Sequence, residues 1–192
     1  MSPNETAWRQ TRQGNIVKSL ATFLNQANLT GFNTTAYLQN ITANASYVPV
    51  GGYAISGGGY LSLMTGLGAL QAMDDRYPPA VAAGTGGLFQ CMTYLTGLSG
   101  GSLAVSTVAA NNFPTVQQLI PQWNTTIPGF LGPNLTNPVP YFQQIFGELV
   151  PKLQAGFTIT MTDLIGRMFS QYYISGYESG INKTYSDIQV SL

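Results

Sequence analysis

The segment Gly97-Leu-Ser-Gly-Gly101 constrains the fold of this chain more than any other, because an apolar run precedes it and a helix-compatible run of small residues follows it. The apolar run spans 88–95 and the small-residue run spans 102–110. A strand, a tight turn that carries a serine, and a helix together form a nucleophile elbow. We therefore expect Ser99 to project from a sheet at the positive end of a helix, with the Gly100 N–H free to help hold an oxyanion.

A five-residue pattern of glycine and serine is weak alone, and a glycine-rich turn without chemistry is the alternative. A second glycine segment, Gly57–Gly59, lies about forty residues upstream, after an expected strand at 47–55 and before an expected helix at 61–73. Its backbone N–H groups could point together at one oxygen, as an oxyanion hole requires. Two successive strand–glycine turn–helix units, 47–73 and 88–110, predict an α/β sheet with functional loops at the strand C-termini.

The remaining segments predict mainly helices and surface. Ser2 and Glu5 form a capping-box pattern at the start of a helical stripe, and residues 28–46 are expected to be an exposed, loop-rich segment. After Pro114 we expect a proline-rich excursion at 121–140, and a strand could begin at 187. We expect one helix or two short ones over 3–27, because Gly14 interrupts the stripe. Further helices are expected at 141–153 and 160–173, the last capped by Thr160 or Thr162 and ended by Gly176.

The charge content excludes several classes of function. Charged residues make up only 7% of the chain, whereas about 25% is usual, and seven basic residues cancel seven acidic ones. Nucleic-acid binding, which needs a basic face, is therefore not expected. No apolar run reaches the roughly 18 residues of a membrane span, and the polar start at residue 1 is not a secretory leader.

Asn-x-Ser/Thr sequons are far more frequent than chance allows. Chance would give about two, and the sequence has eight. Glycans would supply the solubility that charge does not, so we expect a secreted or cell-wall-associated protein whose leader peptide is missing from this sequence. The alternative is a surface that is merely rich in Asn and Thr. The candidate sites are Asn4, Asn28, Asn33, Asn40, Asn44, Asn124, Asn134 and Asn182.

The chain has one cysteine and no histidine. Cys91 lies in the apolar run, which favours a buried free thiol over a disulfide to a partner elsewhere. Zinc ligation is excluded, and no metal or other cofactor is expected. The absence of histidine also removes the Ser-His-Asp triad, so a hydrolase built on Ser99 would need another base, most simply a carboxylate that pairs directly with the serine.

Several motifs, in this order, resemble the fungal lysophospholipase (phospholipase B) family, which is related to the cytosolic phospholipase A2 catalytic domain. The resemblance covers nearly the whole chain but only the N-terminal third or so of such an enzyme. The pairing of Ser-Gly-Gly-Gly with Gly-Leu-Ser-Gly-Gly-Ser is its most specific part. The segments that carry it are Ser2–Thr6, Ala54–Tyr60, Thr65–Gly66, Gly68–Ala69, Gly86–Gln90, Thr93–Ser102, Asn112–Phe113, Ala155–Phe157 and Thr162–Asp163.

The resemblance implies part of a three-layer sheet of the patatin/phospholipase A2 type that is incomplete at its C-terminal side. Residues 1–192 would form the N-terminal part of one catalytic domain. Within it, 47–112 would hold the oxyanion loop and the nucleophile elbow, and 113–192 would be a helical excursion. The family hydrolyses fatty-acyl esters of (lyso)phospholipids through a Ser–Asp dyad, so the implied partner is a phospholipid at a membrane or micelle interface.

By the same resemblance, Ser99 is the nucleophile and Gly58 and Gly59 are oxyanion-hole residues, with Gly100 as a further candidate. The family's catalytic Asp lies far downstream in an Asp-Gly context. No aspartate of this chain is followed by glycine, so we expect the base to be absent and the isolated chain to be inactive as a carboxylic-ester hydrolase. The four aspartates are Asp74, Asp75, Asp163 and Asp187, of which the first pair is expected to end a helix and Asp163 to lie in a first helical turn.

One departure from the family leaves an alternative open. Leu61 stands where the family usually has an arginine that is thought to meet the substrate phosphate. With the missing base, this makes a non-catalytic secreted glycoprotein, or a degenerate paralogue, the second hypothesis. A dinucleotide-binding unit is a third, because Asp74 follows Gly57–Gly59 at a suitable distance; the G-x-G-x-x-G spacing, however, is not met.

Overall fold

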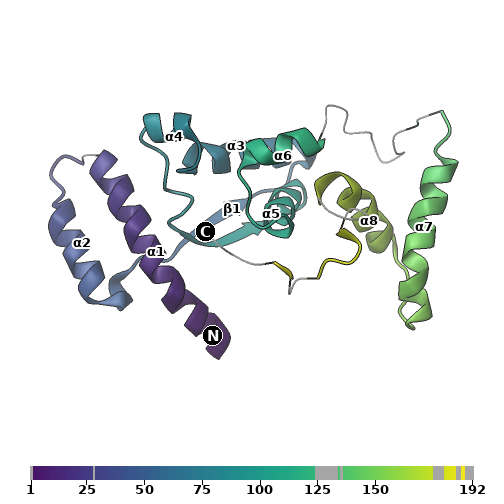
Figure 1. Cartoon of the computed structure of the whole chain (residues 1–192), viewed down its shortest axis with the longest axis horizontal. Coiled ribbons are helices and arrows are strands. Elements are labelled where there is room, and N and C mark those ends of the chain that lie inside the picture. Colours follow the sequence, from purple (N-terminus) through teal and green to yellow (C-terminus); the bar gives the residue numbers. More distant parts are fainter. Residues whose placement is uncertain are drawn as a thin grey trace. The chain divides into compact units, whose positions relative to one another are not determined.

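The computed structural model describes residues 2–27, 29–123, 134, 136–174, 180–184 and 187–188. They fall into two compact units, 2–108 and 109–188. The chain is a mixed α/β protein that is mostly helical (Figure 1). Among the described residues, the only sheet has two strands, β1 (Gly51–Ile55) and β2 (Met92–Gly97).

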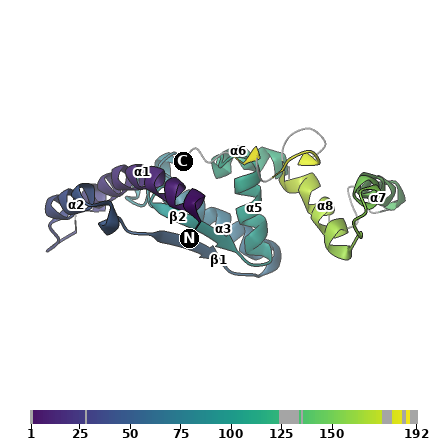
Figure 2. The same cartoon turned by 90° about the horizontal axis from the view of Figure 1, so that it is seen from below.

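The two strands are parallel and lie next to each other, as Figure 2 shows. The register pairs Tyr53 with Leu95 and Ile55 with Gly97, after an irregularity between Gly51 and Gly52. Because the strands are parallel and in register at their ends, the turns that follow them emerge at one edge of the sheet. Each strand leads into a helix, α3 (Gly59–Met73) or α5 (Gly100–Ala110), so the two expected strand–glycine turn–helix units are confirmed.

Helix α3 packs directly on β1. Its buried leucines, Leu63, Leu67 and Leu70, follow the 3–4 spacing of one helix face. A methyl group at Gly66 would lie 2.7 Å from the Ile55 side chain, so the glycine sets how closely helix and strand approach. Helix α4 (Pro78–Ala82), which the sequence analysis did not predict, lies in the connection from α3 to β2.

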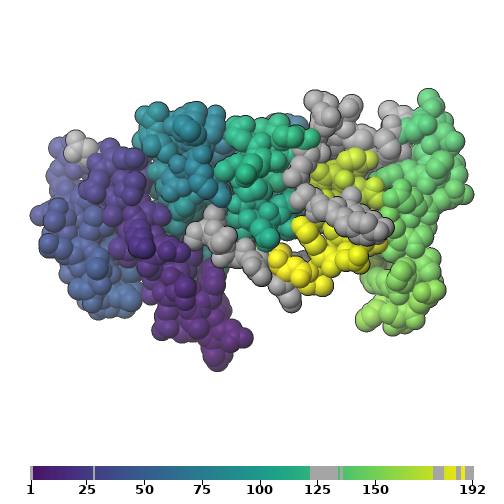
Figure 3. Space-filling model, in the orientation of Figure 1, coloured from purple at the N-terminus to yellow at the C-terminus, as the bar shows by residue number. Residues whose placement is uncertain are grey.

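The N-terminal helix α1 (Pro3–Ala27) is confirmed over its full predicted length, and Ser2 Oγ accepts a hydrogen bond from the Glu5 N–H as expected of its cap. It runs beside α2 (Thr34–Ala43), as both views show, and the two helices form one surface in Figure 3. Their shared core is a cluster of Ile16, Ile41 and Val48.

The loop-rich prediction for 28–46 was wrong, because α2 and a 3-10 turn (Ala45–Tyr47) occupy much of it. The Asn33 side chain caps α2 by accepting from the Ala36 N–H at 2.9 Å, and Ile41 gives the helix a buried face. The strand predicted at 47–55 is confined to 51–55, and the second strand starts at 92 instead of 88.

The second unit is built on two helices, α7 (Val139–Gln154) and α8 (Met161–Tyr173), which confirm the helices predicted at 141–153 and 160–173. Tyr141, Ile145 and Leu149 of α7 pack with Met168 of α8. Short helical segments α6 (Val116–Leu119) and η2 (Ile120–Trp123) precede them and were not predicted. Most of the 121–140 excursion, Gly176 and most of the strand predicted from 187 lie outside the described residues.

Candidate active site

The turn between β2 and α5 places Ser99 in a conformation that few non-glycine residues adopt. Its φ is +51°, in the left-handed region, and its side chain is exposed. Backbone bonds fix the turn: the Leu98 N–H donates to the Ile55 carbonyl at 3.0 Å, and the Gly101 N–H donates to the Leu98 carbonyl at 2.9 Å. A polar side chain is thus held outward where the strand ends and the helix begins, as predicted for an elbow.

The glycines around Ser99 are required by close backbone approach. A methyl group at Gly97 would lie 2.3 Å from the Gly101 carbonyl oxygen, and one at Gly101 would lie 2.3 Å from the Ile55 carbonyl oxygen. Both distances are far below van der Waals contact, so no larger residue fits without moving backbone. The turn therefore closes only with glycine at both positions.

The upstream glycine loop lies directly against this turn. A methyl group at Gly100 would lie 1.9 Å from the Gly59 carbonyl oxygen, and one at Gly57 would lie 3.2 Å from Ser99 Cβ. Gly58 and Gly59 have φ values of +151° and +61°, which side chains disfavour. The structure thus brings together the four residues that the sequence analysis singled out for attack and oxyanion binding.

Backbone donors are available around Ser99. Within the described residues, the N–H groups of Gly58, Gly59 and Gly100 donate to no acceptor. Gly59 begins α3 and Gly100 begins α5, so the unpaired N–H groups of two helix starts lie at this edge of the sheet. Such an arrangement can accept a developing negative charge on an oxygen bound there.

The Ser99 hydroxyl makes no hydrogen bond to any residue that the structure describes. Asp74 and Asp75 follow the last residue of α3, a 15-residue helix, and so lie about 20 Å along the helix from the glycine loop. Asp163 and Asp187 belong to the second unit, where their carboxylates accept from the backbone N–H groups of Thr160 and Thr184 respectively.

The sequence pattern predicts only part of the structural role of Asp74. It ends α3 as expected, but it is also buried, and its carboxylate accepts from the Arg76 guanidinium at 2.7 Å and from Gln90 Nε2 at 2.8 Å. Burial alone would raise the pKa of Asp74, but the hydrogen bonds from Arg76 and Gln90 outweigh it and lower the pKa. The network ties the end of α3 to the approach of β2.

A second contact that the sequence analysis missed comes from α1. The Arg12 side chain is 5% exposed, and its guanidinium donates to the carbonyls of Gln90 at 3.0 Å and Met92 at 2.9 Å. Seventy-eight residues separate Arg12 from Gln90, so no local pattern reveals the pair. The only available signal was a charged residue on the apolar face of α1, four residues before Ile16.

Cys91 lies between these two carbonyls as a half-buried free thiol. Burial raises the pKa of Cys91 to about 11, although the nearby Arg12 charge lowers it slightly. A thiol with this pKa is almost wholly protonated near neutral pH and is a poor nucleophile. Cys91 therefore adds nothing to the chemistry around Ser99. No described group of three or more His, Cys, Asp or Glu residues could hold a metal ion.

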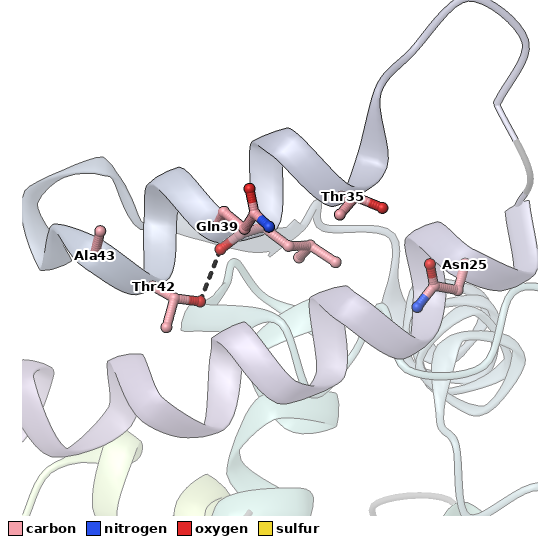
Figure 4. Close-up of a pocket in the computed structure, with 6 residues that line it drawn as sticks. Asn25, Thr35, Gln39, Thr42 and Ala43 are labelled. Carbon is pink, nitrogen blue, oxygen red and sulfur yellow. Dashed lines mark hydrogen bonds between the residues drawn. The ribbon is translucent and has the colours of Figure 1, made fainter.

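A hollow in the described surface lies between α1 and α2 (Figure 4). Its volume is about 470 Å³. The side chains that line it are mostly polar and come from both helices, and the only large apolar one is Leu38. It contains none of the predicted site residues. The lining residues are Asn25, Thr35, Leu38, Gln39, Thr42 and Ala43.

Six of the eight sequon asparagines can be placed. All six are exposed: Asn4, Asn33, Asn40, Asn44, Asn134 and Asn182. Asn28 and Asn124 lie outside the described residues. In the part of the chain that the structure describes, no helix has the length and apolar character needed to cross a membrane.

The family model and the curated relatives that match this chain are all described as lysophospholipases. A family model described as lysophospholipase catalytic domain matches residues 52–191. The chain is similar to lysophospholipase 2 of Aspergillus fumigatus, with 39% identity over 200 residues that cover 100% of this chain and 34% of that protein. Lysophospholipase 2 of Saccharomyces cerevisiae is 36% identical over 202 residues, covering 98% of this chain and 28% of that protein.

A third relative, lysophospholipase of Penicillium chrysogenum, is 35% identical over 199 residues, covering 98% of this chain and 32% of that protein. The chain thus spans about a third of the length of the curated relatives that it matches. No solved structure matches it.

Proposed function

The chain belongs to the lysophospholipase catalytic domain family, and from that premise we propose that it carries the nucleophile and the oxyanion-binding loop of an enzyme that hydrolyses fatty-acyl esters of (lyso)phospholipids. The observation that carries the proposal is the exposed Ser99 at φ +51°, with Gly100 packed on the backbone of Gly59. On this proposal β1 and β2 are neighbouring strands of a larger three-layer sheet of the patatin/phospholipase A2 type.

The proposed reaction has two stages. Ser99 Oγ attacks the ester carbonyl carbon and gives its proton to a carboxylate base, while the carbonyl oxygen becomes an oxyanion that accepts hydrogen bonds from Gly58, Gly59 and Gly100. The intermediate collapses by breaking the bond to the alcohol oxygen, which takes the proton and leaves as the glycerophospho-alcohol. Water then attacks the acyl-serine, returns its proton through the base, and releases the fatty acid.

The base in this scheme is an aspartate outside the 192 residues, as family resemblance implies. The positions of the four aspartates support this, because Asp74 and Asp75 lie at the far end of α3 and the others cap turns in the second unit. We therefore propose that the isolated chain hydrolyses esters slowly or not at all. It would act as an enzyme only with a sequence that supplies the base.

Labelling with a fluorescent fluorophosphonate tests this proposal. The 192-residue chain should label weakly, and a protein extended by the downstream coding sequence to the length of the relatives should label strongly. Ser99→Ala should abolish the strong labelling, while Ser106→Ala, which removes an exposed serine from α5, should not. Equal labelling of the extended protein with and without Ser99 would contradict the assignment of the nucleophile.

One observation favours a second candidate, a non-catalytic secreted glycoprotein or degenerate paralogue. Leu61, which stands where the family usually has arginine, is 73% exposed in the first turn of α3 and offers no charge to a phosphate. The downstream coding sequence distinguishes the two candidates. A frame that continues into an Asp-Gly segment favours the enzyme, whereas a stop after codon 192 favours the non-catalytic protein.

A further inference from the structure

Ser62 contacts the glycine loop at two points. Its hydroxyl donates to the carbonyl of Ser56, the residue before Gly57–Gly59, and its N–H donates to the Gly58 carbonyl at 3.4 Å. Its Cβ also limits the space at Gly58, where a methyl group would lie 3.3 Å away. One residue of α3 therefore bonds to the start and to the middle of the loop.

Beyond these bonds, the loop is restrained mainly by its packing against Ser99 and Gly100. Gly57, Gly58 and Gly59 are exposed, and Gly58 caps α3 without a side-chain hydrogen bond. Three consecutive glycines have a large conformational freedom, and fixing them costs more entropy than fixing any other residue. Donors that stabilise an oxyanion must be held in place before the reaction, so a loop of this composition needs a restraint.

A serine at position 62 lowers the stability of the helix unless its hydroxyl makes a hydrogen bond. The residue is 8% exposed and is followed by the buried Leu63. Alanine forms helices better than serine, and burying a hydroxyl is unfavourable without a partner. The Ser56 carbonyl is the hydrogen-bond partner of this hydroxyl, and the bond restrains the chain where the glycine loop begins.

We propose that Ser62 is a positioning residue that holds the Gly57–Gly59 loop against Ser99 and Gly100. It does not touch the substrate and acts through the N–H groups of Gly58 and Gly59. The inference rests on the proposed function for its catalytic meaning, but the restraint itself is a property of the folded chain. It can therefore be measured without any activity.

The experiment compares backbone order parameters from ¹⁵N relaxation in the 192-residue chain and its variants. With Ser62 present, the amides of residues 57–59 should have order parameters of about 0.85, and Ser62→Ala should lower them below about 0.6. Ser62→Thr keeps a hydroxyl and should restore them. Thr65→Ala is the matched control: it removes another α3 hydroxyl, which donates to the Leu61 carbonyl at 2.8 Å, and should leave the loop unchanged.

Two results would overturn the proposal: loop order parameters in Ser62→Ala equal to those of the parent chain, or an equal loss in Thr65→Ala. If Ser62→Ala does not fold, Ser62→Cys, which keeps the size but donates only weakly, is measured in its place with the same expectations. Fluorophosphonate labelling of Ser99 in the extended protein is scored separately. Absence of that labelling counts against the proposed function and leaves the restraint by Ser62 standing.

Discussion

At the scale of the residue, Gly100 joins the two halves of the proposed site. Gly100→Ala would push a methyl group to 1.9 Å from the Gly59 carbonyl oxygen. Because the obstacle is backbone on both sides, the loop or the helix start must move, and we expect a loss of more than about 3 kcal/mol of unfolding free energy. Urea denaturation followed by circular dichroism measures it.

Gly68→Ala is the matched control for this substitution. Gly68 lies inside α3 with nothing within 4 Å of an added methyl group. The same change should there raise the unfolding free energy by about 0.5–1 kcal/mol, because alanine forms helices better than glycine. Equal effects of the two substitutions would show that the contact between Gly100 and Gly59 is not as close as described.

At the scale of the element, the buried Arg12 side chain binds α1 to β2, in addition to the exposed hydrogen bond from the Tyr94 hydroxyl to Glu5. Arg12→Met keeps an apolar stem on α1 but removes the donor to the buried carbonyl of Gln90 and the partly buried carbonyl of Met92. We expect a loss of about 2–4 kcal/mol of unfolding free energy, measured by urea denaturation. Lys18→Met, which replaces an exposed cation on the same helix, should change it by no more than about 0.5 kcal/mol.

The start of α8 makes the stability of the second unit depend on pH. The Asp163 carboxylate is paired with Lys152 and accepts from the Thr160 N–H, and these bonds lower the pKa of Asp163 from 3.8 to about 2. A carboxyl group whose pKa is lower in the folded state contributes stability above its unfolded pKa. That contribution should be complete above about pH 5 and be lost progressively as the pH falls through 4 toward the folded pKa of about 2 and below it.

Melting temperatures of the parent chain and Asp163→Asn, measured from pH 6 to pH 2, test this dependence. The variant should melt lower at pH 6, and the gap should narrow steadily below pH 4 to a small remainder at pH 2. Thr162→Ala, in the same helical turn, should leave the pH profile unchanged, because Thr160 caps α8. A gap of constant size across the range would mean that Asp163 is not perturbed in the folded state.

The elements differ in how far their sequences predict them. The helices α7 and α8 follow from apolar spacing and from Thr160 and Asp163, all of which act within a turn or two. The α2 helix was missed because its sequons suggest exposed coil, although Asn33 is also a good N-cap. The start of β2 was placed too early because Phe89 and Gln90 are buried by the turn before the strand.

At the scale of the whole molecule, the site was predictable where its contacts are local. The turn at Ser99 and the glycine loop follow from short motifs, and the parallel register of β1 and β2 brings them together. The bonds of Arg12 to the residues around Cys91 span nearly eighty positions, so they depend on the completed fold. The base for Ser99 could not be placed either, because Asp74 and Asp75 lie at the far end of α3 and the carboxylates of Asp163 and Asp187 cap turns in the second unit.

The surface composition leads to the last prediction. Only 7% of the residues are charged, and each of the six sequon asparagines that the structure describes is exposed. We propose that the protein is secreted and that glycans on these sites keep it soluble, since net charge near zero favours association.

The chain secreted from a yeast host should therefore lose mass on treatment with peptide N-glycosidase F, and the treated protein should precipitate at concentrations where the untreated protein stays in solution. Mock-treated protein is the control for the incubation. An unchanged mass, or a deglycosylated protein that remains equally soluble, would show that the low charge of the chain is compensated by something other than glycans.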